Sequence, residues 1–421
     1  TMMWGDANDI AIWTRLTLRG TFANFWRGPK AQRRWTYRKG IHTEDRSRQA
    51  VDAGLLKTLP HISPAQLSAG SPVLHPDLLK PWPVMKSTVV GLTPEVLTVF
   101  DGPRVLFPDG FSRGDRNVRA VYFDGPASFT HSIGVIAGTP LDAPLLQFAA
   151  AYLRSTLARY FLMMRGWKML CERNGLHLTD VESFPFYAPE AARDPETAKA
   201  ALETVLVHME ALRALPELEQ KNSYEMRRSS IDDAIFSYFG LSDDERTLIR
   251  ESVDLLMPSI RPRSFQSLDT PIQKRARRAD ISDYAAALGK SLTEWRDRTS
   301  GTGAFKVSVV ANHDERSGAS GIVKIDWSDA ALGRPASSTA VNDALVLETL
   351  RALRAAGLRM IAPGNHLALV PDVQCWLNGS LYLVRPLNRR SWTYRQALRD
   401  AETIVRSVQD ASLAMQTAGT A

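Results

Sequence analysis

Residues 117–138 read NVRAVYFDGPASFTHSIGVIAG, and this stretch decides the first part of the fold. Apolar residues flank a turn at Asp124-Gly125-Pro126, which is the composition of two short strands joined by a turn. Residues 87–107 repeat this character as a strand, a turn at Asp101-Gly102-Pro103 and a second strand. Together the two segments predict a compact antiparallel block.

The segments after this block are predicted to be mostly helical. Apolar and aromatic residues recur at three- and four-residue spacing over 144–164, which predicts one helix with its aromatic stripe in a core. Residues 178–189 have two phenylalanines beside prolines and predict a strand that ends this module. Helices are expected over 197–214 and 230–239, the second opening with two aspartates at its positive end. Residues 242–245, SDDE, form a capping box for one more helix.

Two further regions flank this part of the chain. At the N-terminus, a helix over 8–18 is predicted to precede a run of basic and aromatic residues. A proline-rich connector over 60–83 comes next, because proline cannot sustain hydrogen-bonded elements. After a basic linker over 258–279, the tail is predicted to have strands over 305–310, 321–327, 359–370 and 381–385 and helices over 340–356 and 394–408.

These elements predict a mixed α+β chain of several domains, since 421 residues exceed one ordinary core. We predict a basic-aromatic segment over 1–60 and an antiparallel-strand and helix module over 61–190. A helical region with a basic linker is predicted over 191–280, and a C-terminal α/β module over 281–421.

Composition excludes some classes of protein. The most apolar segment, 145–164, is interrupted by Arg154 and Arg159, so no run approaches the roughly 18 uncharged apolar residues of a membrane helix. Cys171 and Cys375 lie far apart without metal-ligand spacing, which predicts two free thiols in a reducing cytoplasm. The histidines form no paired motif with a carboxylate, so no metal site is predicted.

The basic residues are concentrated in two runs. The formal net charge is +7, which favours an anionic partner. Residues 15–48 interleave basic with aromatic side chains, a mixture that can pair phosphates while stacking on bases or packing locally. A second basic run spans 261–278. For each run, a solvated surface and a set of phosphate contacts remain open alternatives.

The familiar catalytic signatures are missing from the sequence. It contains no nucleophile elbow, phosphate-binding loop, dinucleotide glycine fingerprint or paired-histidine zinc motif, and no catalytic residue is predicted. Three acids with a lysine loosely match a nuclease constellation, or form the exposed face of a hairpin: Asp314, Glu315, Asp326 and Lys324.

Five segments in series carry a family resemblance. They read PRVLFP at 103–108, VRAVY at 118–122, SFTHSI at 128–133, LLQFAAAYLRS at 145–155 and VESFPF at 181–186. This series resembles the target-recognition (specificity) region of adenine-N6 DNA methyltransferases of the type IIG and type I restriction-modification kind. IDDAIFSYFGL at 231–241 resembles the segment after the recognition domain in single-chain methyltransferases, and WGDAND at 4–9 is similar to the segment after their catalytic domain.

The resemblance implies that residues 61–190 form a DNA target-recognition domain and that the partner is double-stranded DNA. The family's cofactor glycine loop and its Asn-Pro-Pro-aromatic tetrapeptide do not occur in the sequence, so we expect no cofactor site and no methyl transfer from this chain alone. We expect S-adenosylmethionine on a catalytic domain that either preceded Thr1 in a longer chain or is a separate subunit. Such a chain would serve a restriction-modification or phage-defence system.

Phosphate contacts would position the DNA, and contacts to base edges would specify its sequence. The residues expected to make them lie in the basic-aromatic run and beside the turn of the antiparallel block: Arg33, Arg34, Arg38, Lys39, Arg113, Arg116 and Arg119. The alternative is a protein-interaction scaffold of a multi-subunit defence complex, with the tail as its docking module.

Overall fold

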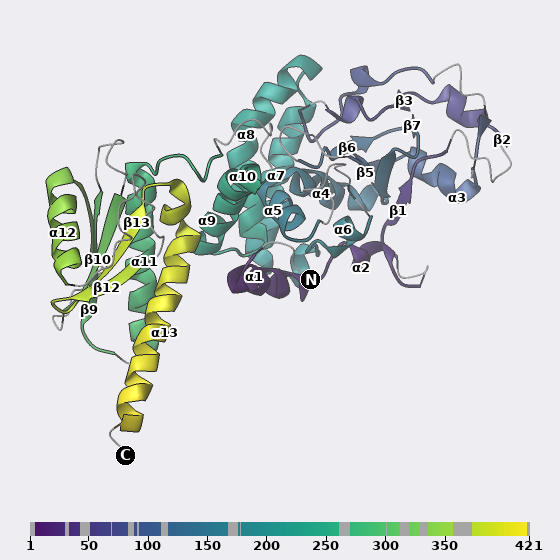
Figure 1. Cartoon of the computed structure of the whole chain (residues 1–421). Helices are drawn as coiled ribbons and strands as arrows, with labels where there is room; N and C mark the ends of the chain where they lie inside the picture. The colour runs from purple at the N-terminus through teal and green to yellow at the C-terminus, as the bar shows by residue number, and fades with distance from the viewer. Residues whose placement is uncertain are drawn as a thin grey trace. The chain divides into compact units, whose positions relative to one another are not determined.

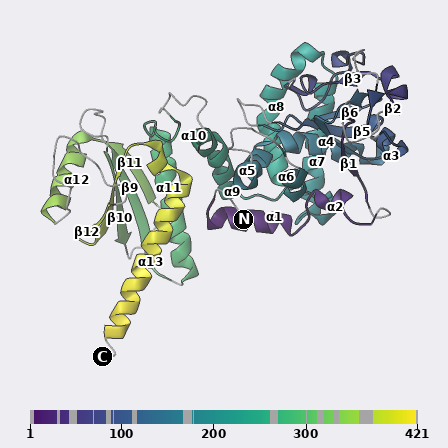
Figure 2. The same ribbon diagram turned by 45° about the vertical axis from the view of Figure 1, so that its right-hand side comes forward.

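The computed structural model describes residues 5–29, 33–42, 51–68, 70–82, 88–90, 92–110, 117–166, 176, 178–260, 270–299, 301–311, 320–328, 336–356 and 373–418. The chain forms two compact units, Thr1–Val253 and Asp254–Ala421, whose elements are shown in Figures 1 and 2. Both units combine helices with a sheet. The prediction of a mixed α+β chain with more than one domain is confirmed.

A four-stranded antiparallel sheet organises the first unit. Across the sheet its strands are β1 (Thr36–Lys39), β8 (Ile133–Ala137), β5 (Pro103–Pro108) and β6 (Val121–Asp124). All residues of β5 and β8 are buried, because these central strands are covered on both faces. Two short pairs accompany the sheet: β2 (Val51–Asp52) with β4 (Thr88–Val89), and β3 (His61–Ile62) with β7 (Ser128–Phe129).

The antiparallel block differs from the prediction in two details. Residues 87–107 are not two strands around a turn: the short β4 is followed by helix α3 (Pro94–Leu97) and a 3-10 turn, η5 (Thr98–Phe100), before β5. Thr93 starts this helix, because its side chain accepts a hydrogen bond from the Val96 amide. In addition, the strands predicted on the two sides of the Asp124-Gly125-Pro126 turn, β6 and β8, are not neighbours in the sheet. Strand β5 lies between them.

The helix predicted over 144–164 is two helices, α4 (Ala143–Arg154) and α5 (Thr156–Arg165). Ser155 interrupts it with extended backbone, and its Oγ accepts from the Ala158 amide at 3.2 Å, as an N-cap does. Buried Asp232 accepts from the amide and hydroxyl of Thr156 at 2.9 and 2.6 Å. Asp232 therefore supports the start of α5 and not that of its own helix, α8 (Glu217–Tyr238), which begins earlier than predicted.

The strand predicted over 178–189 is wrong. Residues there form helix α6 (Leu178–Ser183), followed by a segment that makes a bridge between Thr21 and Pro185. Val181 and Phe184 are fully buried, and their three-residue separation is a helical spacing. The other helices of the unit are α1 (Ala7–Thr17), α2 (Ala23–Trp26), α7 (Pro195–Arg213) and α9 (Asp243–Glu251). The capping box predicted for α9 is confirmed.

The second unit is a five-stranded mixed sheet with helices. Its strand order is β11 (Ala336–Val341), β9 (Ala304–Ala311), β10 (Ser320–Ser328), β13 (Ser380–Pro386) and β12 (Val373–Leu377). Helices α11 (Arg278–Arg298) and α13 (Tyr394–Ala418) lie side by side and share a core with the sheet (Figure 1). The predicted α/β tail is confirmed, although α11, β11 and β12 were not predicted. Helix α12 (Asp343–Ala355) begins later than expected, and the strand predicted over 359–370 lies outside the described residues.

Candidate nucleic-acid interface

Strand β1 places part of the basic-aromatic run at an edge of the first sheet. Its neighbour in that sheet is β8, with Tyr37 opposite Ile136 and Arg38 opposite Val135. At Gly40 the backbone passes so close to Phe129 and Thr130 that a Cβ there would lie 2.4 Å from the carbonyl oxygen of Thr130. Glycine is thus required where the chain leaves β1.

Aromatic packing holds the run against the sheet. Trp35 is 2% exposed and stacks on Phe25 with ring centroids 4.3 Å apart. Trp26 stacks on Tyr37 at 5.5 Å, and Tyr37 lies 6.2 Å from Phe107 of β5. Most of these rings pack locally, which was one of the two roles expected for the run. Tyr37 is half-buried, and burial is the main cause that raises its pKa, so the phenol stays neutral at physiological pH.

A carboxylate from α6 anchors this aromatic segment. Glu182 accepts from Trp26 Nε1 at 2.9 Å and takes two hydrogen bonds from Arg27, at 2.8 and 2.7 Å. Burial raises the pKa of Glu182, but the hydrogen bonds from Arg27 and Trp26 outweigh it and hold the pKa below its ordinary value. This contact joins residues more than 150 positions apart, and no local sequence signal pointed to it.

Beside β1 lies a cleft of about 470 Å³. We call it the β1 cleft; it is lined by Trp26, Arg33, Arg34, Trp35, Thr36, Tyr37, Arg38 and Thr98. It brings together three of the predicted arginines and a partly exposed tyrosine, and none of these described lining residues is acidic. Cations beside an aromatic ring in a concave surface suit a nucleic acid, whose phosphates are anionic and whose bases are planar.

The predicted basic residues of this run already have partners within the chain. Arg33 Nε donates to the Gly28 carbonyl at 2.8 Å. Arg34 Nε lies 2.5 Å from the carboxylate of Asp142, and Lys39 lies 2.7 Å from that of Asp109. Both cations remain nearly half exposed, at 46% and 47%. They are therefore oriented by the protein and still accessible to a ligand.

Asp142 is the buried member of its pair, at 5% exposure. One oxygen accepts from the amide and hydroxyl of Thr139, at 2.9 and 2.8 Å, while the other faces Arg34. Burial raises the pKa of Asp142, but the bonds from Arg34 and Thr139 outweigh it and leave the pKa below its ordinary value. Asp142 is thus ionised at neutral pH and fixes the direction of Arg34.

The structure does not bring all predicted DNA contacts together. Arg119 closely precedes β6, at the opposite edge of the sheet from β1. Three strand spacings separate the two edges, about 14 Å. Arg119 therefore belongs to a different part of the surface from Arg38. Arg113 and Arg116 lie outside the described residues.

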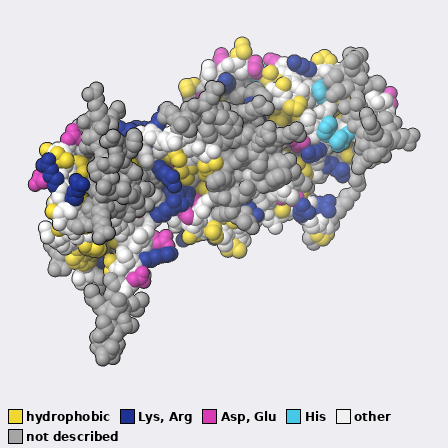
Figure 3. All heavy atoms as spheres, viewed as in Figure 1, with side chains coloured by type: hydrophobic (Ala, Val, Ile, Leu, Met, Phe, Trp, Pro, Cys, Tyr) yellow, Lys and Arg dark blue, Asp and Glu magenta, His cyan; other side chains and the backbone are white. Residues whose placement is uncertain are grey.

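A pair of histidines extends the polar surface near β1. His42 and His131 are both exposed, and their rings stack with centroids 4.2 Å apart. His42 follows β1 in the chain by three residues. On the face shown in Figure 3, lysine and arginine side chains lie beside histidines at the strand-rich end of the first unit.

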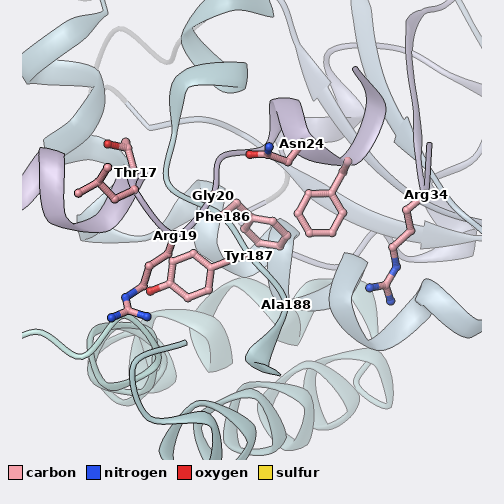
Figure 4. A pocket seen from close by; sticks show the side chains of 10 residues that line it. Thr17, Arg19, Gly20, Asn24, Arg34, Phe186, Tyr187 and Ala188 are labelled. Atoms are coloured by element: carbon pink, nitrogen blue, oxygen red, sulfur yellow. The ribbon is translucent and has the colours of Figure 1, made fainter. Parts of the chain in front are cut away.

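A second cavity, of about 500 Å³, shares Arg34 with the β1 cleft. We call it the Asn24 cavity; it is lined by Thr17, Leu18, Arg19, Gly20, Asn24, Phe25, Arg34, Phe186, Tyr187 and Ala188. In the view of Figure 4, Arg19 and Arg34 lie on opposite sides of Phe186 and Tyr187. Neither Asn24 nor the C-terminal end of α1 was predicted from the sequence to be part of a site.

The second unit gives little geometric support for the nuclease alternative. Asp326 pairs with Lys324 at 2.9 Å and accepts from the Ser380 hydroxyl at 2.5 Å. Asp314 and Glu315 lie outside the described residues. Among the residues that the structure does describe, no three His, Cys, Asp or Glu side chains could hold a metal ion together. None of the described helices is both long and apolar enough to cross a membrane.

Comparison with known proteins gives a weak likeness. No protein-family model matches the chain, and no curated protein matches it. Among solved structures it is similar to the type IIL restriction-modification enzyme MmeI in complex with DNA, with a TM-score of 0.33 and 11% sequence identity. The match covers 53% of this chain and 36% of that one, so the matched part spans about a third of that enzyme's chain. A likeness of this size establishes neither fold nor function.

Proposed function

We propose that this chain binds double-stranded DNA as the target-recognition portion of a site-specific adenine-N6 DNA methyltransferase, in a restriction-modification or phage-defence system. The single observation that carries the DNA-binding part is the β1 cleft, which is lined by Arg33, Arg34 and Arg38 together with Tyr37. The methyltransferase part rests on the sequence resemblance. Methyl transfer from S-adenosylmethionine belongs, in this proposal, to a catalytic domain or subunit distinct from these 421 residues.

The cleft supports phosphate contact through the charge and the exposure of its arginines. Each phosphate that a cation neutralises releases counterions. The logarithm of the binding constant therefore falls with the logarithm of the salt concentration, with a slope of about 0.9 per phosphate contact. Arg34 is held by Asp142 on one side and remains 46% exposed, so a phosphate can approach the outer side of its guanidinium. Contacts to base edges, which would give sequence specificity, would come from residues that enter a groove of the bound DNA.

Titration of the full chain into labelled duplex DNA, read by anisotropy at about 50 and 200 mM salt with random duplex as competitor, tests the proposal. Two phosphate contacts predict that the variant Arg33→Ala/Arg38→Ala lowers the salt slope by about 1.8. The control is Arg213→Ala on α7, whose arginine is 51% exposed and 3.8 Å from Glu210. An unchanged slope in the double variant, with folding intact, removes the cleft from the interface. Absence of wild-type binding at low salt contradicts the proposed function.

The second candidate is a protein-interaction scaffold, and one observation favours it. Trp327 and Trp376, both on the sheet of the second unit, are 45% and 62% exposed. Exposed tryptophans are frequent anchors of protein interfaces. If Trp327→Ser/Trp376→Ser abolishes co-purification of a partner protein and leaves DNA affinity unchanged, the scaffold role stands for this unit. Unaltered co-purification excludes these tryptophans as the docking site.

A further inference from the structure

The Asn24 cavity is the strongest candidate for an extension of the DNA interface. Two arginines, a carboxamide and a phenol belong to its lining, and none of its described lining residues is acidic. Burial raises the pKa of Tyr187 to about 12, while the charges of Arg19 and Arg15 lower it, which places positive potential at the phenol. An anion or a hydrogen-bond acceptor is therefore the ligand that this surface favours.

Internal hydrogen bonds fix the orientation of the Asn24 amide. Its Oδ1 accepts from the Thr21 backbone amide at 2.7 Å and is 3.3 Å from the Thr21 hydroxyl. A backbone N–H requires an acceptor, so oxygen and not nitrogen must occupy this position. The Asn24 side chain lines the cavity. Its NH2 group is therefore a preset donor, and the oxygen is already used.

We propose that the Asn24 cavity binds the phosphodiester backbone of the DNA strand that leaves the β1 cleft, with Asn24 donating to a phosphate oxygen and Arg19 supplying charge. This inference rests on the proposed function: Arg34 lines both cavities, so a DNA strand bound in the β1 cleft would reach the Asn24 cavity past Arg34. It makes Asn24 a donor-only contact. A bidentate reading of adenine by this residue is excluded, because that would need the oxygen as well.

The isosteric change Asn24→Asp separates this role from a structural one. Aspartate keeps an oxygen for the Thr21 amide but replaces the donor with a second, charged acceptor, which would face a phosphate. The matched control is Asn8→Asp on α1, where an exposed asparagine outside the cavity lining acquires the same charge. Both variants reduce the net charge by one, so any general electrostatic effect appears in both.

The experiment measures duplex affinity of the full chain by anisotropy at two salt concentrations, with thermal melts to verify folding. We expect Asn24→Asp to weaken binding about tenfold and Asn8→Asp less than about twofold. Arg19→Ala should lower the salt slope by about 0.9. If Asn24→Asp matches Asn8→Asp while Arg33→Ala/Arg38→Ala still weakens binding, the proposed function stands and this inference is overturned. If the wild-type chain binds no duplex at low salt, both are overturned.

Discussion

Replacing Asp142 by Asn should strengthen DNA binding while it weakens the fold. The asparagine oxygen can accept from Thr139 as the present carboxylate does, so the amide nitrogen then faces Arg34. Two donors cannot bond to each other, and Arg34 loses the carboxylate that directs it. A phosphate approaching Arg34 would no longer compete with the buried carboxylate.

The magnitude follows from Coulomb's law. A phosphate on the outer side of the Arg34 guanidinium would lie about 7 Å from the Asp142 carboxylate, a repulsion of about 0.6 kcal/mol in bulk water. Because Arg34 is 46% exposed, the water value is the appropriate one. Removing this repulsion should raise affinity about threefold. The lost pair should reduce the free energy of unfolding by about 1 kcal/mol, a figure discounted for solvent screening.

Anisotropy titrations at low salt and denaturant unfolding measure the two effects on the same preparation. The control is Asp233→Asn, because it removes one negative charge and releases Arg250, which is also 46% exposed but lies on α9 outside the cleft lining. Affinity should rise more in Asp142→Asn than in the control. Equal changes in both variants, or a loss of affinity in Asp142→Asn with folding intact, would refute the role of Arg34 as a phosphate contact.

Three further predictions concern the fold that carries these sites. Asp142 and Glu182 have pKa values below their ordinary values of 3.8 and 4.5. The stability that they contribute is therefore present above those values and should fall on acidification below pH 4.5, which tryptophan fluorescence would measure. Gly40→Ala should destabilise the first unit by about 1–3 kcal/mol or more in chemical unfolding, because its Cβ would meet backbone oxygen at 2.4 Å. In the second unit, Arg385→Met should lower the free energy of unfolding by about 3–5 kcal/mol, because the buried Asp400 loses its counter-charge. Adding Asp400→Leu should recover most of that loss.

The sequence was sufficient for elements whose cause is local. The apolar spacing of α7 and the capping box at Ser242 lie within one element each, and both predictions are confirmed. The helix over 144–164 was misjudged at Ser155 because its apolar pattern continues without a gap, whereas the N-cap preference of one serine decides the break. Helix α6 was predicted as a strand because the phenylalanines beside prolines favour a strand. The three-residue spacing of Val181 and Phe184, which is typical of a helix, was not taken into account.

Much of the site could not be predicted, because it depends on contacts between distant segments. Composition identified the arginines of the β1 cleft, but not the carboxylates that orient them. Asp142 is 108 positions from Arg34, and Glu182 is 155 from Arg27. Arg119 was predicted as a DNA contact beside the turn of the antiparallel block, and the strand order places it near the opposite edge of the sheet from Arg38.

The ion pairs beside β1 bear on how a DNA-binding surface could discriminate. Arg34 and Lys39 each hold a carboxylate within 2.7 Å, so a phosphate must displace or share that partner before it gains from either cation. A ligand that satisfies one cation alone therefore gains little net energy, whereas a polyanion that reaches both, together with Arg33 and Arg38, gains from several at once. Such an arrangement lowers affinity for isolated phosphates and favours an extended, regularly charged strand.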